Sequence, residues 1–146
     1  MKRLPSILAG MLALGAFGAA AWASHAVFER MPHLEDEFAN LWQAEVMADG
    51  EIALPSPEFP RSFMVPFVVD YQGVRFGKYP PGWPALLSLG VRLGAPWLVN
   101  ALLAGACAWL TYRLGKRLGG EAVGLLGALL VATSPMFLLL TASLKS

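Results

Sequence analysis

Long uncharged stretches dominate the hydrophobic pattern of the chain. Three of them, residues 4–28, 93–112 and 122–144, contain no Asp, Glu, Lys or Arg. Each has about the length, roughly 20 residues, that an α-helix needs to cross the hydrocarbon core of a bilayer. Backbone polar groups inside lipid need internal partners, so these stretches are expected to be helical. The pattern predicts about three transmembrane helices, at 1–28 (with a short cytoplasmic tail), 95–114 and 122–144.

The polar region between the first two helices is too long to be a simple connector. It covers residues 29–94, and nine of the ten acidic residues lie between Glu29 and Asp70. Loops longer than about 12–15 residues are usually functional or disordered. The many aromatic residues of this region argue against disorder, so we expect a folded loop.

Within this loop the pattern predicts short helices and a hairpin. Apolar residues recur at helical spacing between residues 37 and 49, and Gly50 is expected to end that helix. Segments 67–69 and 74–76 flank a turn at 70–73, which predicts a small β-hairpin. Residues 83–93 are expected to form a second short helix at the membrane surface. The predicted fold class is an all-α membrane protein with interfacial helices, and this small hairpin, in one long external loop.

Basic residues set the expected orientation. Cytoplasmic loops of membrane proteins carry an excess of Lys and Arg. The first helix is preceded by Lys2 and Arg3, and the predicted cytoplasmic turn at 115–121 lies among Arg113, Lys116 and Arg117. We therefore expect an integral protein of a bacterial-type plasma (inner) membrane, with the N-terminus in the cytoplasm and loop 29–94 outside it.

The first apolar stretch has an alternative interpretation as a signal peptide. Ala21-Trp22-Ala23 resembles the small-residue pattern of a cleavage site. The stretch is long for the apolar part of a signal peptide, which favours a retained helix. Both interpretations leave the acidic loop on the same side of the membrane.

Composition narrows the class of protein further. The net charge is +1 and there is no basic stripe, so a nucleic-acid-binding protein is not expected. Cys107 is the only cysteine, which excludes an intrachain disulfide, and we expect its side chain to be buried.

Two charged clusters of the loop are candidates for chemistry. Glu35-Asp36-Glu37 follows the first membrane exit and could hold a cation, with His33 as a further ligand; the structural alternative is that Asp36 is the N-cap of the next helix. The second cluster runs from Arg75 to Gly82 and sets two cations beside a proline-rich turn. It suits a phosphate group bound by Lys78, or alternatively a lysine attracted to anionic lipid.

The order of these features resembles the GT-C glycosyltransferases, and most closely the protein-mannosyltransferase-like and aminoarabinose-transferase-like group (glycosyltransferase family 39 type). The resemblance covers residues 30–146, and its specificity lies in the order and spacing of its motifs. These are Asp36-Glu37 opening a helix, Leu41-Trp42-Gln43-Ala44, Gly77-Lys78-Tyr79-Pro80-Pro81-Gly82, the run from Gly94 to Asn100, and Thr133-Ser134-Pro135.

The resemblance implies transfer of a sugar from a polyprenyl-phosphate donor to a lipid, glycan or protein acceptor outside the cytoplasm. It makes Asp36 the catalytic base or a metal ligand, and Glu37 a helper or helix-capping group. Lys78 would bind the donor phosphate, with Arg75 and Tyr79 as weaker candidates. The resemblance leaves open whether the reaction needs a divalent cation, Mg²⁺ or Mn²⁺.

Two further expectations concern the whole chain. Family members usually have more membrane helices, so the chain looks like the N-terminal portion of a GT-C bundle that is inactive alone. The alternative class is a small non-enzymatic membrane subunit whose loop binds a partner or lipid. A transporter fragment is less favoured, because no predicted span has an ionisable residue at its middle.

Overall fold

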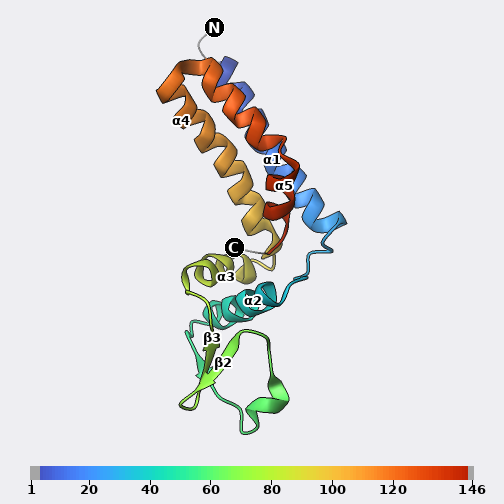
Figure 1. Cartoon of the computed structure of the whole chain (residues 1–146), viewed down its shortest axis with the longest axis vertical. Helices are drawn as coiled ribbons and strands as arrows, with labels where there is room; N and C mark the ends of the chain where they lie inside the picture. Colours follow the sequence, from blue (N-terminus) through green and yellow to red (C-terminus); the bar gives the residue numbers. More distant parts are fainter. Residues whose placement is uncertain (1–3, 145–146) are drawn as a thin grey trace. The chain divides into compact units, whose positions relative to one another are not determined.

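The computed structural model describes residues 4–144, which form two compact units (Figure 1). Unit 1 contains the chain up to Arg30 and the segment Asn100–Ser143. Unit 2 contains Met31–Val99 together with Leu144. The basic residues Lys2 and Arg3, on which part of the predicted orientation rests, lie outside the described residues.

Unit 1 is a set of packed helices. It comprises α1 (Leu4–Ala26), most of α4 (Trp97–Ala132) and α5 (Pro135–Ala142), and α1 packs against α5. Gly120 interrupts α4 with φ 85° and ψ −177°, in a region of backbone space that favours glycine. The two segments of α4 on either side of Gly120 therefore fold back beside each other (Figure 1).

Small residues allow these two segments to approach closely. A Cβ atom added to Gly124 would lie 2.6 Å from the carbonyl oxygen of Tyr112, and one added to Gly115 would lie 2.8 Å from the Cα of Gly124. On the side facing α1, a Cβ on Gly105 would lie 3.0 Å from the carbonyl oxygen of Ala13. Small residues at these positions allow the helix backbones to approach closely.

The prediction of three membrane-spanning helices is not supported. In the described part of the chain, α1 alone is long and apolar enough to cross a membrane, and a second candidate arises only if the bent pair α3–α4 counts as one span. The second stretch falls short because α4 begins at Trp97 and reaches Arg113 within fewer than the roughly 20 residues a span needs. The third is broken at Ser134, the N-cap of α5, because Pro135 cannot continue the preceding helix.

Unit 2 combines two helices with a small sheet. Helices α2 (Glu35–Ala48) and α3 (Gly82–Arg92) lie close to the two segments predicted as short helices, and they pack against each other. Strands β1 (Leu54–Pro55), β2 (Val68–Tyr71) and β3 (Val74–Gly77) form an antiparallel sheet of order β1-β3-β2, with a 3₁₀ turn at Pro60–Phe63 between β1 and β2. The described chain is mostly helical, as predicted, but the predicted hairpin is part of a three-stranded sheet, so the fold is not purely all-α.

The β2–β3 hairpin is confirmed, with a tighter turn than predicted. Its loop is Gln72-Gly73, with positive φ angles of 51° and 81°. Such angles are typical of the two-residue turns that match the twist of hairpin strands. Asp70 and Tyr71, predicted as turn residues, belong to β2.

The helices of unit 2 are joined by an apolar core and a polar cap. Ala44, Leu87, Val99 and Leu144 form the buried cluster. Arg92 at the end of α3 donates from Nε to the carbonyl oxygen of Ala48 at 2.8 Å. Its guanidinium thus satisfies a terminal carbonyl of α2 and ties the two helices together.

Candidate functional site

A buried glutamine connects α2 to the end of the sheet. The side-chain oxygen of Gln43 accepts a hydrogen bond from the backbone N–H of Gly77 at 2.6 Å, and its amide nitrogen donates to the carbonyl oxygen of Ile52 at 2.8 Å. Gln43 is buried, and both its side-chain oxygen and its side-chain nitrogen have hydrogen-bond partners. Gln43 therefore fixes the point at which the chain leaves β3 and enters Lys78.

Lys78 lies beside an aromatic pair. Its backbone N–H donates to the carbonyl oxygen of Phe67 at 2.8 Å, and its Nζ lies 5.1 Å from the centroid of the Phe67 ring. The Tyr79 ring meets Phe67 edge-on, with the two centroids 5.6 Å apart. The structure brings two predicted site residues, Lys78 and Tyr79, to the same aromatic ring.

Phe67 also lines a hollow of about 620 Å³ in unit 2. The lining is mostly apolar and includes Pro60, Met64 and Val68, together with one cation, Arg61, and the carboxylate of Asp70. Sequence reasoning missed Arg61 because it lies in the loop between β1 and β2, far along the chain from the Lys78 motif. No local pattern marks it; only the folding of that loop against β2 does.

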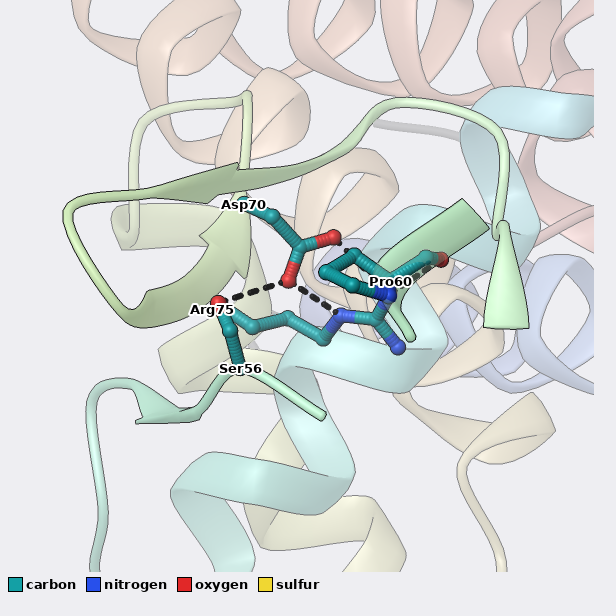
Figure 2. A network of polar contacts seen from close by, with 4 residues as sticks. All are labelled: Ser56, Pro60, Asp70 and Arg75. Atoms are coloured by element: carbon teal, nitrogen blue, oxygen red, sulfur yellow. Dashed lines mark hydrogen bonds and ion pairs between the residues drawn. The ribbon is translucent and has the colours of Figure 1, made fainter. Parts of the chain in front are cut away.

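Arg75, the other predicted cation, has a structural contact instead. Figure 2 shows its guanidinium against Asp70, with Nε 2.9 Å from Oδ1 and Nη2 2.8 Å from Oδ2. Ser56 donates to the same carboxylate at 2.8 Å, and Arg75 also reaches the carbonyl oxygen of Pro60 at 3.4 Å. With 8% of its surface exposed, Arg75 braces the hairpin against the 56–60 loop.

The ion pair alters the titration of both partners. The hydrogen bond from Arg75 lowers the pKa of Asp70 below its ordinary value; desolvation opposes this shift, and Ser56 adds to it. The same bond raises the pKa of Arg75. Both groups stay charged in the folded protein at neutral pH, and the pair has no net charge to offer a phosphate.

The acidic cluster Glu35-Asp36-Glu37 forms the first turn of α2, and its side chains differ in burial and in contacts. Glu37 is 1% exposed and accepts a hydrogen bond at 2.8 Å from the backbone N–H of His33, the residue before the N-cap, so it ties the entering chain to the first turn of α2. Leu34 is the N-cap and has no side-chain cap, so the prediction of Asp36 as N-cap is wrong. Asp36 is half-buried in the first turn, where the helix dipole favours its negative charge.

Asp36 and Gln43 lie on one face of α2. They are seven residues apart, which is two helical turns with an offset of about 20°. Because Gln43 contacts Gly77, Asp36 faces the side of α2 on which β3 ends and Lys78 begins. The rise of an α-helix places it about 10 Å along the axis from that contact.

One buried donor adjoins this region. The indole N–H of Trp83, in the first turn of α3, is the single buried side-chain polar atom between residues 4 and 144 that has no hydrogen-bond partner. Buried polar atoms are nearly always paired. Trp83 packs against the core cluster of unit 2 just beyond the Tyr79–Gly82 turn, and sequence reasoning assigned it no role.

The residues proposed for a metal do not gather around one point. Over residues 4–144, no group of three or more His, Cys, Asp or Glu side chains is placed to hold a metal ion. Glu37, the neighbour of Asp36, is turned toward His33 by its hydrogen bond. We therefore assign no chemical step to a metal.

Comparison with known proteins adds no relative, since no family model, curated protein or solved structure matches this chain.

Proposed function

We propose that this chain is part of a membrane glycosyltransferase that takes a sugar from a polyprenyl-phosphate donor on the extracytoplasmic side. One observation carries the proposal. The Nζ of Lys78 lies over the ring of Phe67, and Phe67 lines an apolar hollow that also includes Arg61 and the ion-paired Asp70. Asp36 faces the same side of α2 as the Gln43–Gly77 contact that positions Lys78. Cations beside an apolar hollow suit a lipid phosphate.

The charges of unit 2 support a phosphate at this hollow. Arg75 is neutralised by Asp70. Within the described residues, neither Lys78 nor Arg61 takes part in an ion pair. Their positive charges are therefore available to an anion, and hydrogen bonds between charged groups are the strong ones.

The surface of unit 1 supports a place in the membrane. Large apolar side chains are exposed along all its helices, including Leu14 (71%) on α1, Leu130 (70%) on α4 and Met136 (73%) on α5. Monomeric soluble proteins rarely expose apolar patches larger than a few hundred Å². We propose that these helices lie in lipid and that unit 2 lies on the extracytoplasmic side.

The proposed chemistry needs one base and one anion site. The Asp36 carboxylate takes the proton of an acceptor hydroxyl as its oxygen attacks the anomeric carbon of the donor sugar. The bond from that carbon to the phosphate oxygen breaks, and its electron pair leaves with the phosphate. Lys78 and Arg61 balance the charge of the departing phosphate. A single direct displacement inverts the configuration at the anomeric carbon.

The first test removes the proposed base. In the intact membrane protein that contains this chain, Asp36→Asn should abolish sugar transfer while membrane insertion is retained, because an amide cannot accept the proton. Glu35→Gln is the matched control: it removes an exposed carboxylate from the same turn and should keep transfer near normal. The measurement is incorporation of radiolabelled sugar from the lipid donor. Near-normal transfer by Asp36→Asn would refute the assignment of the base.

The alternative is a non-enzymatic membrane subunit whose loop binds a partner. The exposed side chains Phe59, Phe63 and Met64 in the β1–β2 loop favour it, because they offer an apolar surface. The DNA that follows codon 146 discriminates the two functions. A reading frame that continues through further apolar spans favours the transferase, and a stop codon favours the subunit.

A further inference from the structure

A second group of cations lies in unit 1, where the segment of α4 before Gly120 lies beside the start of α1. A hollow of about 400 Å³ is lined there by Ser6, Trp109, Tyr112, Arg113, Lys116 and Arg117. Lys116 pairs with Glu121 at 2.6 Å. Between residues 4 and 144, no ion pair involves Arg113 or Arg117. The hollow therefore has an excess of positive charge.

The floor of this hollow is built from paired groups. Tyr112 is buried, and its hydroxyl donates to Glu121 at 2.7 Å and lies 3.1 Å from the hydroxyl of Ser6. The Nζ of Lys116 lies 5.7 Å from the centroid of the Tyr112 ring. Glu121 is thus occupied by Lys116 and Tyr112, and its charge is not directed at the two arginines.

An apolar hollow meets the basic one at the same arginines. It has a volume of about 530 Å³ and is lined by Arg113 and Arg117 together with Cys107, Leu110, Thr111 and Leu114. The last four residues follow the spacing i, i+3, i+4, i+7 and so lie on one face of α4. Cys107, predicted to be buried, is exposed on this face, as are Leu110 and Leu114.

We propose that this face of α4 binds one anionic phospholipid. Arg113 and Arg117 contact its phosphate from the basic hollow, and an acyl chain lies along Cys107, Leu110 and Leu114. We assign a lipid because a free phosphate has no apolar part that could occupy the apolar hollow. Basic pockets between membrane helices are known to bind anionic headgroups. The inference rests on the membrane placement of unit 1 in the proposed function, and on none of its sugar chemistry.

The test measures lipid retention by the purified full chain in detergent. Native mass spectrometry compares phosphatidylglycerol with phosphatidylcholine of identical acyl chains, and inorganic phosphate is added as a competitor. Phosphatidylglycerol should be retained about fivefold better or more, which is the effect of a single basic residue at an anionic surface. Inorganic phosphate at equal concentration should not displace it. Equal retention of the two lipids, or displacement by phosphate, would overturn the proposal.

Variants separate this site from general charge effects. Arg117→Gln should lower phosphatidylglycerol retention about fivefold. Arg30→Gln, which removes the same charge beyond the far end of α1, should change it little. Leu110→Gln should lower the retention of both lipids, because it places an amide in the acyl-chain hollow. Equal losses for Arg117→Gln and Arg30→Gln would contradict the site.

The outcome is independent of the donor site. Retention of phosphatidylglycerol that depends on Arg117, without binding of polyprenyl phosphate, would support this inference and contradict the transferase. Binding of polyprenyl phosphate that depends on Lys78, without preference for phosphatidylglycerol, would do the reverse.

Discussion

At the scale of single residues, Arg75 shows how a pairing partner decides a role. The sequence places it beside Lys78, and the resemblance makes it a candidate for the donor phosphate. In the structure it pairs across the strands with Asp70, as the register Asp70↔Arg75 requires. Opposite charges at such cross-strand positions attract. Placing the turn at 70–73 concealed this pair, whereas a two-residue turn at Gln72-Gly73 predicts it.

Acid should weaken this hairpin. The pKa of Asp70 is lowered in the folded state, so its pairing stabilises unit 2 above the ordinary carboxyl pKa of about 3.9. That stability is lost as the pH falls through the lower, folded-state pKa. We expect the thermal unfolding midpoint of the purified chain to decrease when the pH is lowered below about 4. Asp70→Asn should be less stable at neutral pH and should lack this part of the acid dependence.

The control for this prediction is Asp49→Asn, which changes an exposed carboxylate at the end of α2. Its acid profile should match that of the unchanged protein. If Asp70→Asn also kept the same profile and midpoint, the ion pair would contribute nothing to the stability of the sheet.

The separate roles of Glu35, Asp36 and Glu37 could be predicted only in part. Three consecutive carboxylates predict the start of a helix, and α2 does start there. The sequence does not say which of the three turns inward. Glu37 does so because its carboxylate reaches the N–H of His33, one turn back. That contact leaves Asp36 as the candidate base.

At the scale of elements, apolar length alone overestimated the membrane helices. The stretch 122–144 is uncharged throughout, yet Ser134 and Pro135 end one helix and begin another. Residues 93–96 are apolar but form the turn between α3 and α4. In both places, local backbone chemistry decides where a helix ends. The reversal of α4 is at Gly120, whose left-handed φ interrupts the helix.

Close packing of the two α4 segments gives a prediction at this scale. Gly124→Ala should destabilise unit 1 by about 1–3 kcal/mol, the usual cost of overpacking, because its Cβ would lie 2.6 Å from the carbonyl oxygen of Tyr112. Loss of helical circular dichroism on heating in detergent measures the effect. Gly15→Ala is the control, since a Cβ there has no neighbour within 4 Å. Its stability should rise by up to about 1 kcal/mol through helix propensity. Equal stabilities for the two variants would refute the close contact.

At the scale of the whole molecule, charge and apolar length mark out much of the region that folds as unit 2. The polar loop predicted at 29–94 overlaps the Met31–Val99 part of unit 2, because its charged residues separate it from the long uncharged stretches. The hollow lined by Arg61 and Phe67 was not predictable. It depends on how an irregular loop lies against β2, and no hydrophobic period encodes such a loop.

We propose that unit 2 binds a lipid-linked phosphate through Lys78 and Arg61. Titration of the purified chain with polyprenyl phosphate tests this proposal. We predict saturable binding that Lys78→Ala and Arg61→Ala each weaken about tenfold, the effect of losing one charged hydrogen bond, and that Arg30→Gln leaves unchanged. Absence of saturable binding, or equal binding by all three variants and the unchanged chain, would contradict a phosphate site at Lys78 and Arg61.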